Sequence, residues 1–487
     1  MNYESVIGLE VHAELSTASK VFCGCSTRFG AGPNSQTCPV CLGLPGVLPV
    51  LNRKVVEDAL KIALALNCHI SPYSRFDRKN YYYPDLPKNY QISQNYLPFA
   101  ENGYLDIPLE KGRKRVGIHN IHLEEDAGKN LHGEGLDSGE SLVDLNRAGV
   151  PLIEMVTHPD MRSLEEVEKF MTFLRDILLY LDVCDCCMEE GSLRFEANIS
   201  LRLAGESELG NRVEMKNLNS FKMVSKALRY EMKRQEEILR QGGRIKSETR
   251  LWDEKKEVTS VMRSKEDAPD YRYFPEPDLP PLIIETRRID EIRKRMPELP
   301  QERKLRFLRE YKIPEYDARI LTADRSLADF YEDAVRLFPE AKTVSNWVMG
   351  EMLRKLRERN IRPGDCPLTV SHLAGLLNLI KEGTISGRVA KDVFAEMFDS
   401  GREAEEVVRE KGWIQLSDED EVRKITEEII EKNPQSVKDF RSGKKKALGF
   451  LMGQVMKATR GQANPQMVSK LLKERLQTID LKADIRP

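Results

Sequence analysis

The stretch SLRFEANISLR, residues 192–202, decides the fold of the first part of the chain. Apolar side chains occupy every second position, at Leu193, Phe195, Ala197, Ile199 and Leu201. Serine, asparagine and charged side chains occupy the positions between them. Because successive side chains of a strand point to opposite faces, this alternation predicts a strand with one buried and one polar face. Such strands are typical of antiparallel sheets, whereas strands of parallel sheets are usually buried on both faces.

The N-terminal segment shows the same alternation. Apolar residues Ile7, Leu9 and Val11 alternate with Gly8, Glu10 and His12. Helical spacing of apolar residues predicts helices at about 53–66, 163–182 and 220–241. The sequence therefore predicts an α+β fold, in which helices interrupt an antiparallel sheet.

Helix boundaries are marked by residues with capping preferences. Ser163 followed by Glu166 is a capping-box pattern at the start of the second helix. Gly242 is expected to end the third helix. The proline-rich segment PEPDLPP, residues 275–281, is typical of an extended connector.

The chain is too long for one hydrophobic core, since it has 487 residues. Strands and helices are mixed up to about residue 290, and only helical patterns follow. A glycine and a glutamate-rich stretch suggest another division near 400–410. We therefore predict a sheet domain at 1–290, an all-helical domain at 291–405 and a small helical tail domain at 406–487.

Composition restricts the class of protein. Apolar residues make up 40% and charged residues 32% of the chain, which is typical of a globular protein. No apolar run approaches the roughly 18 residues that a membrane span needs, and the N-terminus lacks a targeting pattern. We expect a cytoplasmic protein that does not contact a membrane. Residues 435–487 contain twelve Lys or Arg against four Asp or Glu, and such a basic tail favours binding of a polyanion.

Four of the nine cysteines are paired along the chain, as Cys23-x-Cys25 and Cys38-x-x-Cys41. Four thiolates at this spacing suit a tetrahedral Zn²⁺ ion. Reduced buried thiols or a redox pair are the alternatives. A closed four-cysteine zinc site would be structural, since it has no open position for a substrate.

Acidic residues gather on the expected polar face of the sheet. Glu10 and His12 share a face of one strand, Glu196 and Glu214 can project from two others, and Glu124 and Glu125 stand at a strand end. Crowded carboxylates repel one another unless a cation neutralises them, and oxygen ligands with one imidazole suit Mg²⁺ bound with a phosphorylated substrate. The alternative is that each carboxylate lies on a solvated strand face.

Residues 75–94, RFDRKNYYYPDLPKNYQISQ, combine four cationic side chains with four tyrosines. An adenine and a triphosphate, or the end of a nucleic acid, would need such a combination, although a polar surface loop is the alternative. A GxxxxGK[ST] loop and a strand-linked GxGxxG turn are both absent from the sequence. No amidase-type cluster of serine and lysine residues is visible in the sequence.

Several long motifs resemble the B subunits of heterotrimeric aspartyl/glutamyl-tRNA amidotransferases. The motifs follow one another in family order over nearly the whole chain: IGLEVHAEL (7–15), CPVCLGLPGVLPVLN (38–52), FDRKNYYYPDLPKNYQISQ (76–94), VDLNRAGVPLIEMVTHPD (143–160), MEEGSLRFEANIS (188–200), EMKNLNSF (214–221), ETRLWDE (248–254) and MRSKEDAPDYRYFPEPDLPPL (262–282). The resemblance implies a cradle-like catalytic domain, a helical domain and a small helical tail domain.

The resemblance also implies a reaction. Members of this family phosphorylate the side-chain carboxylate of Glu-tRNA(Gln) or Asp-tRNA(Asn) with ATP, and ammonia then displaces the phosphate. The ammonia comes from glutamine hydrolysed in the amidase (A) subunit and travels through an internal channel, while a small C subunit binds both larger subunits. A non-catalytic RNA-binding protein, in which zinc and the tail only position tRNA, is the rival hypothesis.

The family pattern assigns roles to individual residues of this chain. Mg²⁺ ligands are expected at Glu10, His12, Glu124, Glu125, Glu196 and Glu214. Because phosphoryl transfer needs mainly positioning and charge neutralisation, we hypothesise nucleotide contacts at Tyr83, Asp85, Lys88 and Arg194. We also expect Lys79 and Lys88 to act with Glu10, His12 and Glu125 in phosphoryl transfer. Thr157 and His158 resemble the mouth of the ammonia channel, although His158 could equally be structural.

Three positions depart from the family pattern. Phe195-Glu196 stands where Cys-Asp is usual, Pro269 where His is common, and Asn89 where Gly is common. Glu196 is one methylene longer than aspartate, which could move its carboxylate away from a bound cation.

The tail resembles the tRNA-binding domain of the family. Basic residues precede and follow an apolar helix, at Lys444, Lys445, Lys446, Lys457 and Arg460. Because RNA helices are recognised largely through phosphates and 2′-hydroxyls, such a face can select tRNA by its shape. A merely solvated basic face is the alternative.

Overall fold

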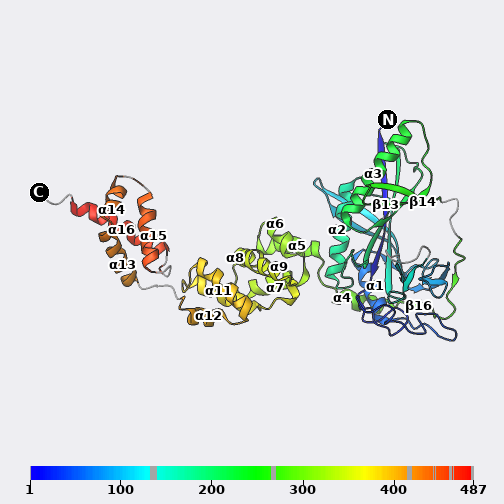
Figure 1. The fold of residues 1–487 in the computed structure, drawn as a ribbon, viewed down its shortest axis with the longest axis horizontal. Coiled ribbons are helices and arrows are strands. Elements are labelled where there is room, and N and C mark those ends of the chain that lie inside the picture. Colours follow the sequence, from blue (N-terminus) through cyan, green and yellow to red (C-terminus); the bar gives the residue numbers. More distant parts are fainter. Residues whose placement is uncertain are drawn as a thin grey trace. The chain divides into compact units, whose positions relative to one another are not determined.

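The computed structural model describes residues 2–131, 140–264, 270–413, 419–442, 444, 446–459, 463 and 465–483. The chain divides into two compact units, Met1–Pro300 and Gln301–Pro487 (Figure 1). Lys445 and Arg460, which are expected tRNA contacts, lie outside the described residues, as does Pro269, a departure from the family pattern.

A nine-stranded sheet forms the centre of the first unit, in the order β14-β13-β12-β11-β1-β10-β7-β6-β2. In chain order its strands are β1 (Tyr3–Glu14), β2 (His69–Ile70), β6 (Ala100–Pro108), β7 (Arg113–Glu125), β10 (Pro151–Thr157), β11 (Leu193–Leu203), β12 (Val213–Leu218), β13 (Glu248–Asp253) and β14 (Val258–Ser264). Every neighbouring pair is antiparallel except β12 and β13. The predicted antiparallel sheet is therefore confirmed with one exception, which arises because the helix α3 (Phe221–Arg240) connects these two strands as a crossover.

The predicted alternation decides which face of the sheet is buried. β11 pairs with β1 along nearly its whole length, from Tyr3 opposite Leu203 to Ala13 opposite Leu193. The alternating apolar residues of 192–202 are buried, together with Ile7, Leu9 and Val11 of β1. The polar residues between them point to the other face, as predicted.

Three smaller sheets border the main one. β4 (Asp77–Asn80) lies between β5 (Tyr90–Ser93) and β15 (Phe274–Pro275), β3 (Tyr73–Ser74) pairs with β16 (Leu282–Ile283), and β8 (Lys129–Leu131) pairs with β9 (Leu142–Asp144). The polar segment at 75–94 thus forms a hairpin of β4 and β5 rather than a plain loop. β15 brings the tyrosines near residue 271 beside this hairpin.

Helices cover the apolar face of the sheet, and their limits agree with the predicted ranges: α1 (Arg53–Ala65), α2 (Leu164–Tyr180) and α3. α2 and α3 pack side by side along the sheet (Figure 1). Ser163 caps α2, because its Oγ accepts a hydrogen bond from the Glu166 amide at 3.2 Å. The reciprocal bond of the predicted capping box is shifted by one residue, since Glu166 Oε2 accepts from the Arg162 amide at 2.8 Å. Gly242, with φ +76°, follows the end of α3 as expected.

The region after the sheet is helical, as predicted. Its elements are α4 (Thr286–Arg295), α5 (Pro300–Tyr311), α6 (Glu315–Leu321), α7 (Arg325–Leu337), α8 (Ala341–Trp347), a π-helical turn (Val348–Met352), α9 (Leu353–Arg359), a 3₁₀ turn (Pro363–Asp365), α10 (Val370–Lys381), α11 (Gly387–Ser400), α12 (Ala404–Lys411), α13 (Glu419–Lys432), α14 (Pro434–Arg441), α15 (Lys446–Ala458) and α16 (Pro465–Ala483). α4 belongs to the first unit, because its Ile292 packs in the core of the sheet domain.

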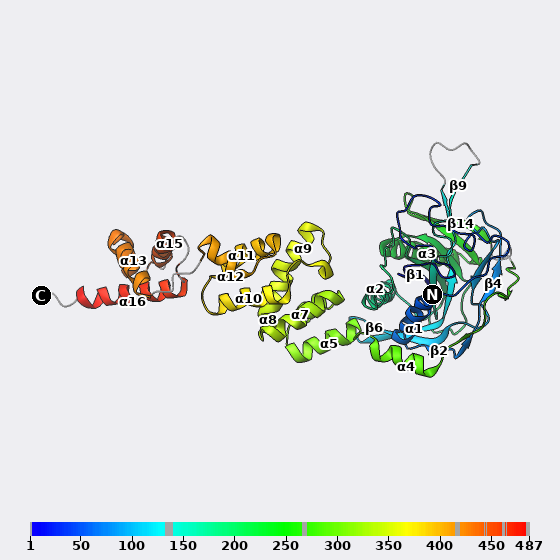
Figure 2. The same cartoon turned by 90° about the horizontal axis from the view of Figure 1, so that it is seen from below.

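The second unit contains two hydrophobic cores. The first extends from Phe307 to Val408 and includes residues of α12. The second extends from Val422 to Leu476 and is formed by α13, α15 and α16 (Figure 2). The domain limits at 290 and 405 remain predictions of the sequence, and the observed packing places α12 with the helices that precede it.

Candidate active site

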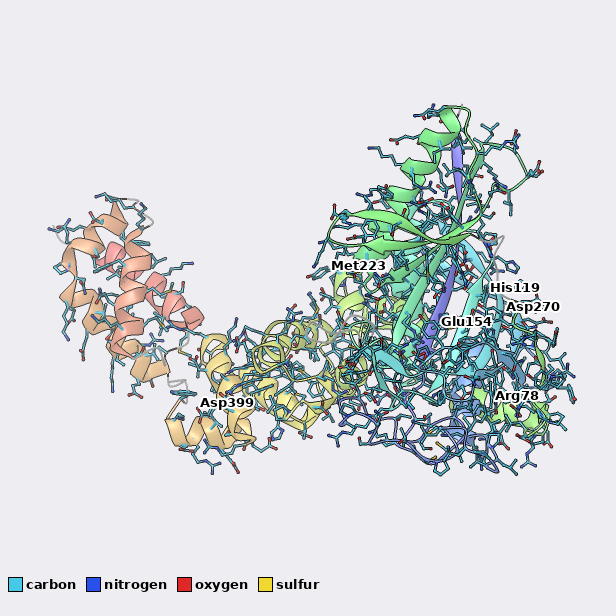
Figure 3. The ribbon with its side chains drawn as sticks, turned by 45° about the vertical axis from the view of Figure 1, so that its right-hand side comes forward. Arg78, His119, Glu154, Met223, Asp270 and Asp399 are labelled. Atoms are coloured by element: carbon cyan, nitrogen blue, oxygen red, sulfur yellow. The ribbon has the colours of Figure 1, made fainter. Side chains whose placement is uncertain are left out.

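The polar face of the sheet gathers titratable side chains from five adjacent strands. On β1, Glu10 lies opposite Glu196 of β11, and His12 lies opposite Glu154 of β10. β12 extends this polar face on one side and β7 on the other. Figure 3 shows Glu154 within this part of the sheet. Glu10 and His12 share this face, as predicted, but each belongs to a different cluster of ligand atoms.

The first cluster consists of Glu10, Glu196 and Glu214, whose carboxylate oxygens lie within 4.8 Å of one another. Lys216 Nζ lies 2.6 Å from Glu196 and 3.3 Å from Glu214. Asn198 Nδ2 donates a hydrogen bond to Glu10 at 2.8 Å. Burial, followed by the charges of Glu154, Glu196 and Glu214, raises the pKa of Glu10. The extra methylene of Glu196 does not remove its carboxylate from the cluster.

The second cluster consists of His12, Glu124 and Glu154, again with ligand atoms within 4.8 Å. Glu154 lies between two imidazoles, at 3.4 Å from His12 Nε2 and 2.8 Å from His122 Nε2. Burial alone would lower the pKa of His12. The neighbouring Glu154 and Glu124 carboxylates outweigh burial and raise this pKa to about 9. The two histidines also hold the pKa of Glu154 well below its ordinary value despite the burial of that carboxylate.

Glu154 and His122 are functional candidates that sequence reasoning missed. Glu154 is the one charged residue in the strand PLIEMVT, 151–157, and a lone carboxylate in an apolar strand was the available signal. His122 precedes the predicted acidic pair by two positions and therefore shares the face of Glu124.

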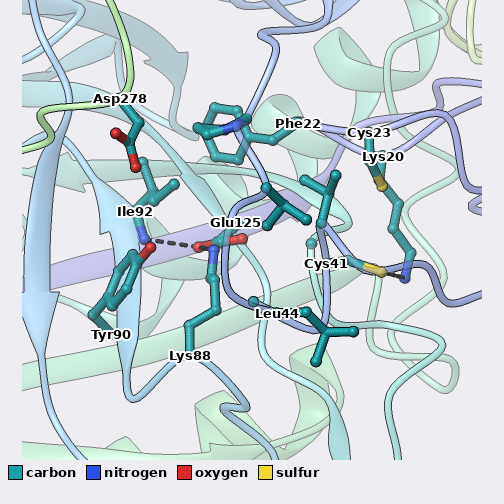
Figure 4. A pocket seen from close by; sticks show the side chains of 15 residues that line it. Lys20, Phe22, Cys23, Cys41, Leu44, Lys88, Tyr90, Ile92, Glu125 and Asp278 are labelled. Atoms are coloured by element: carbon teal, nitrogen blue, oxygen red, sulfur yellow. Dashed lines mark hydrogen bonds and ion pairs between the residues drawn. The ribbon is translucent and has the colours of Figure 1, made fainter.

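The structure does not bring Glu125 together with the other expected Mg²⁺ ligands. Glu124 and Glu125 are neighbours on β7, so their side chains point in opposite directions. Glu125 forms an ion pair with Lys88 and accepts a hydrogen bond from the Ile92 amide at 2.9 Å. It lines a separate cavity that also contains Lys20 and Cys41 (Figure 4). Glu125 thus positions Lys88 and binds the backbone of β5 at Ile92.

Lys79 is an expected cation whose charge interacts with the second cluster. Its pKa is raised although burial opposes this, because the Glu124 carboxylate and then nearby tyrosine oxygens favour the ammonium form. The ammonium lies 5.0 Å from the centre of the Tyr271 ring and 5.8 Å from that of Tyr81. A cation framed by aromatic rings beside carboxylates provides both a charge and a stacking surface.

The other expected nucleotide contacts are distributed more widely. Arg194 lies opposite His12 on β11, where its Nη2 is 3.0 Å from Asp126. Tyr83 is exposed, and the Asp85 carbonyl accepts a hydrogen bond from the Gly128 amide at 2.9 Å. Asn89, which replaces the common glycine, adopts φ +59°, a left-handed conformation that asparagine tolerates better than most residues.

Thr157 and His158, the expected channel residues, lie at the end of β10. Thr157 is buried, and its Oγ1 accepts a hydrogen bond from the Leu9 amide at 2.9 Å. The His158 amide donates to the Gly117 carbonyl at 2.8 Å, and its ring packs edge-on against His119 with centroids 5.2 Å apart. These contacts give His158 a structural role.

All four expected zinc ligands come together. The sulfur atoms of Cys23, Cys25, Cys38 and Cys41 lie within 4.8 Å of one another. Hydrogen bonding from Cys23, together with the ammonium of Lys20, lowers the pKa of Cys41 to about 4. Four sulfur donors on two short loops fit a tetrahedral Zn²⁺ ion, which requires thiolates.

Three basic residues of the tail fall in the described part of the chain. Lys444, Lys446 and Lys457 are all exposed, and the last two lie on α15. Lys446 and Lys457 are three helical turns apart and therefore share one side of that helix.

Comparisons with known proteins cover most of the chain. Residues 5–290 match the family described as the GatB/GatE catalytic domain, and residues 329–476 match a family described as the GatB domain. None of the described helices combines the length and apolar character that crossing a bilayer requires.

Three similar relatives are named as B subunits of aspartyl/glutamyl-tRNA(Asn/Gln) amidotransferase. The one from Moorella thermoacetica is 57% identical over 476 residues, covering 98% of this chain and all of the relative. Those from Carboxydothermus hydrogenoformans and Thermodesulfovibrio yellowstonii are 55% and 54% identical, and each alignment covers 97% of this chain and 99% of the relative. The chain therefore belongs to the family of aspartyl/glutamyl-tRNA(Asn/Gln) amidotransferase B subunits.

Proposed function

We propose that this chain performs the ATP-dependent step of a tRNA-dependent amidotransferase. It transfers the γ-phosphoryl group of ATP to the side-chain carboxylate of Glu-tRNA(Gln), Asp-tRNA(Asn) or both, releasing ADP. Ammonia then attacks the activated carbonyl carbon and phosphate leaves, which produces the amide. The observation that carries this proposal is the pair of acidic clusters on neighbouring strands.

The two clusters are the proposed Mg²⁺ sites. Glu10, Glu196 and Glu214 would hold one cation, and His12, Glu124 and Glu154 the other. The residues fit this role because buried carboxylates crowd together and raise the pKa of Glu10, so a cation would relieve their repulsion. Bound Mg²⁺ neutralises charge on the oxygens of the transferred phosphoryl group. His12 must give up its proton to become a ligand, which Glu154 opposes until a cation replaces that positive charge.

The remaining residues bind and orient the substrates. Lys79, whose ammonium form the Glu124 carboxylate favours by raising its pKa, would contact phosphate oxygens. Lys88, which Glu125 holds in the separate cavity beside Cys41, is proposed as a further contact for the nucleotide. Tyr83, Asp85 and Arg194 complete the proposed nucleotide contacts. Thr157 and His158 are the proposed point at which ammonia enters.

The proposed reaction is divided between several chains, so this chain needs partners. We infer that a separate glutaminase chain, the A subunit, hydrolyses glutamine and supplies ammonia, that a small C subunit joins the two, and that misacylated tRNA is bound by the tail. The four-cysteine cluster would hold a structural Zn²⁺ ion that stabilises residues 23–41.

The test is to trap the phosphorylated substrate. The assembled complex, given Glu-tRNA(Gln), Mg²⁺ and γ-labelled ATP but no glutamine or ammonia, is expected to transfer label to the aminoacyl-tRNA and release ADP. Added ammonia should then discharge the label as phosphate and yield Gln-tRNA(Gln). Release of ADP no faster than without tRNA would favour the rival hypothesis of a non-catalytic RNA-binding protein.

Reversing two charges on α15 is expected to weaken tRNA binding. Lys446→Glu with Lys457→Glu should lower tRNA affinity about tenfold or more, and should reduce the slope of log affinity against log salt by about two, because two phosphate contacts are lost. Filter binding at several salt concentrations measures both quantities. Lys294→Glu with Lys381→Glu, at two exposed positions outside the tail, is the matched control. An unchanged salt slope in the α15 variant would assign the basic face to solvent alone.

A further inference from the structure

A buried lysine lies directly against the four-cysteine cluster. Lys20 is fully buried, with 0% of its surface exposed. Its Nζ lies 3.6 Å from Cys41 Sγ and 3.4 Å from the Leu145 carbonyl oxygen, to which it donates hydrogen bonds (Figure 4). The Lys20 backbone amide also donates to the Cys25 carbonyl at 2.9 Å. Lys20 therefore contacts both pairs of cysteines, one through its backbone and one through its side chain.

The packing around Lys20 holds its ammonium in this place. Gly149 adopts φ +85°, and a Cβ atom built there would lie 3.5 Å from Lys20 Cδ and 3.5 Å from the Cys41 Cβ. The lysine stem thus occupies the space between Gly149 and the cysteine loop. The Val21 amide donates to the Gly149 carbonyl at 3.0 Å, which fixes the chain next to Lys20 against this glycine.

The ammonium needs a negative partner that carboxylates do not provide. Removing a lysine charge from water is costly unless an opposite charge compensates it. Within the described residues, the acceptors of Lys20 Nζ are a sulfur atom and a neutral carbonyl, and it makes no ion pair with a carboxylate. Four thiolates exceed the charge of one Zn²⁺ ion by two negative charges. Lysine and cluster therefore compensate each other.

We propose that Lys20 is the charge-compensating and positioning residue of the metal–thiolate centre. Its ammonium halves the excess negative charge of the occupied cluster and orients the Cys41 sulfur through a hydrogen bond. This inference rests on the proposed zinc site, and it is independent of the proposed phosphoryl transfer. Groups that contact metal ligands in this way tune how tightly the metal is held.

The test is a double-mutant cycle on zinc affinity in the full-length chain. Lys20→Met keeps a side chain of similar length without charge, and Cys41→Ser removes its sulfur partner. Chelator competition should show about a tenfold or larger loss of Zn²⁺ affinity for Lys20→Met in the wild-type background, and little further loss in the Cys41→Ser background. Lys61→Met is the control, because Lys61 binds another buried group, Asp58, at 2.9 Å, and its loss should leave zinc affinity unchanged.

A spectroscopic readout separates a direct contact from a general loss of stability. With Co²⁺ in place of Zn²⁺, the thiolate-to-metal charge-transfer band should shift in Lys20→Met but keep its position in Lys61→Met. If Lys20→Met does not fold, Lys20→Gln, which retains a donor without the charge, is expected to show the same loss of zinc affinity.

Two results would overturn the inference about Lys20. One is equal zinc affinity in the wild-type and Lys20→Met chains, and the other is the same loss in both backgrounds of the cycle. A wild-type chain that binds no Zn²⁺ would instead remove the zinc site itself, while the trapping experiment on phosphoryl transfer would stand unaffected.

Discussion

Glu154→Gln is expected to lower tRNA-dependent ADP release by the assembled complex about a thousandfold. Glu154 lies between His12 and His122 and supplies one of the three ligand atoms of the second cluster. Glutamine has nearly the same size but no negative charge. The substitution therefore removes the negative charge of a proposed Mg²⁺ ligand and also the carboxylate that pairs with His12. Single-turnover measurement of ADP at saturating ATP and Glu-tRNA(Gln) gives the rate.

Asp106→Asn is a suitable control for this prediction. Asp106 is a carboxylate of the same sheet, and it pairs with Arg115 on the neighbouring strand at 2.8 Å near the surface. Since an exposed ion pair contributes little, this variant should retain the wild-type rate. Glutaminase activity should be unchanged in both variants, because we propose that another chain hydrolyses glutamine. Rapid ADP release by Glu154→Gln would exclude the second cluster as a cation site.

Glu332→Ala is expected to destabilise the helical unit by about 3–5 kcal/mol. Glu332 on α7 is buried, and its carboxylate accepts hydrogen bonds from Arg303, from Arg306 at 2.7 Å and from the Tyr311 hydroxyl at 3.0 Å. Alanine would leave the buried Arg303 guanidinium with only the half-exposed Asp329 carboxylate, at 2.6 Å, as its ion-pair partner among the described residues. Hydrogen exchange of the α7 amides, followed by mass spectrometry, measures the loss locally within the full chain.

The effect of Glu332→Ala should depend on pH. Hydrogen bonds from Arg306 and Arg303 outweigh burial and lower the pKa of Glu332 to about 2. A lowered pKa means that the unfolded chain takes up the proton first, so the stabilisation is complete above the ordinary glutamate pKa and is lost as the pH falls toward 2. The difference between wild type and variant should therefore shrink below about pH 4. Glu310→Ala, at an exposed partner of Arg306, is the control and should change stability little. An equally large effect from Glu310→Ala would show that the burial of Glu332 does not determine how much it stabilises the fold.

Much of the fold could be predicted because it depends on local periodicity. The alternation at 7–12 and 192–202 assigns each residue to a face, whatever its neighbours are. Helical spacing and capping residues place α1, α2 and α3 within a residue or two of their observed limits. The parallel pairing of β12 and β13 was not predicted, because the order of strands depends on contacts between distant segments.

The candidate site was predicted only in part, for the same reason. Period-two alternation requires Glu10 and His12 to share a face. In the structure, polar residues of the neighbouring strands lie opposite them, with Glu196 opposite Glu10 and Glu154 opposite His12. The same alternation separates Glu124 from Glu125 but does not say which of the two joins His12. That choice depends on the register between β7 and β10, which sets His122 opposite Glu154.

By itself, the sequence determined the alternating strands, the capped helices, the paired cysteines and the motifs of the amidotransferase B subunits. These features depend on residues close together along the chain or on the order of short segments. Only the tertiary structure decided that the acidic residues form two clusters, that Glu154 and His122 belong beside His12, and that Lys20 lies against Cys41. Those contacts join segments far apart in the chain, and their geometry follows from strand register and packing, which local sequence patterns do not specify.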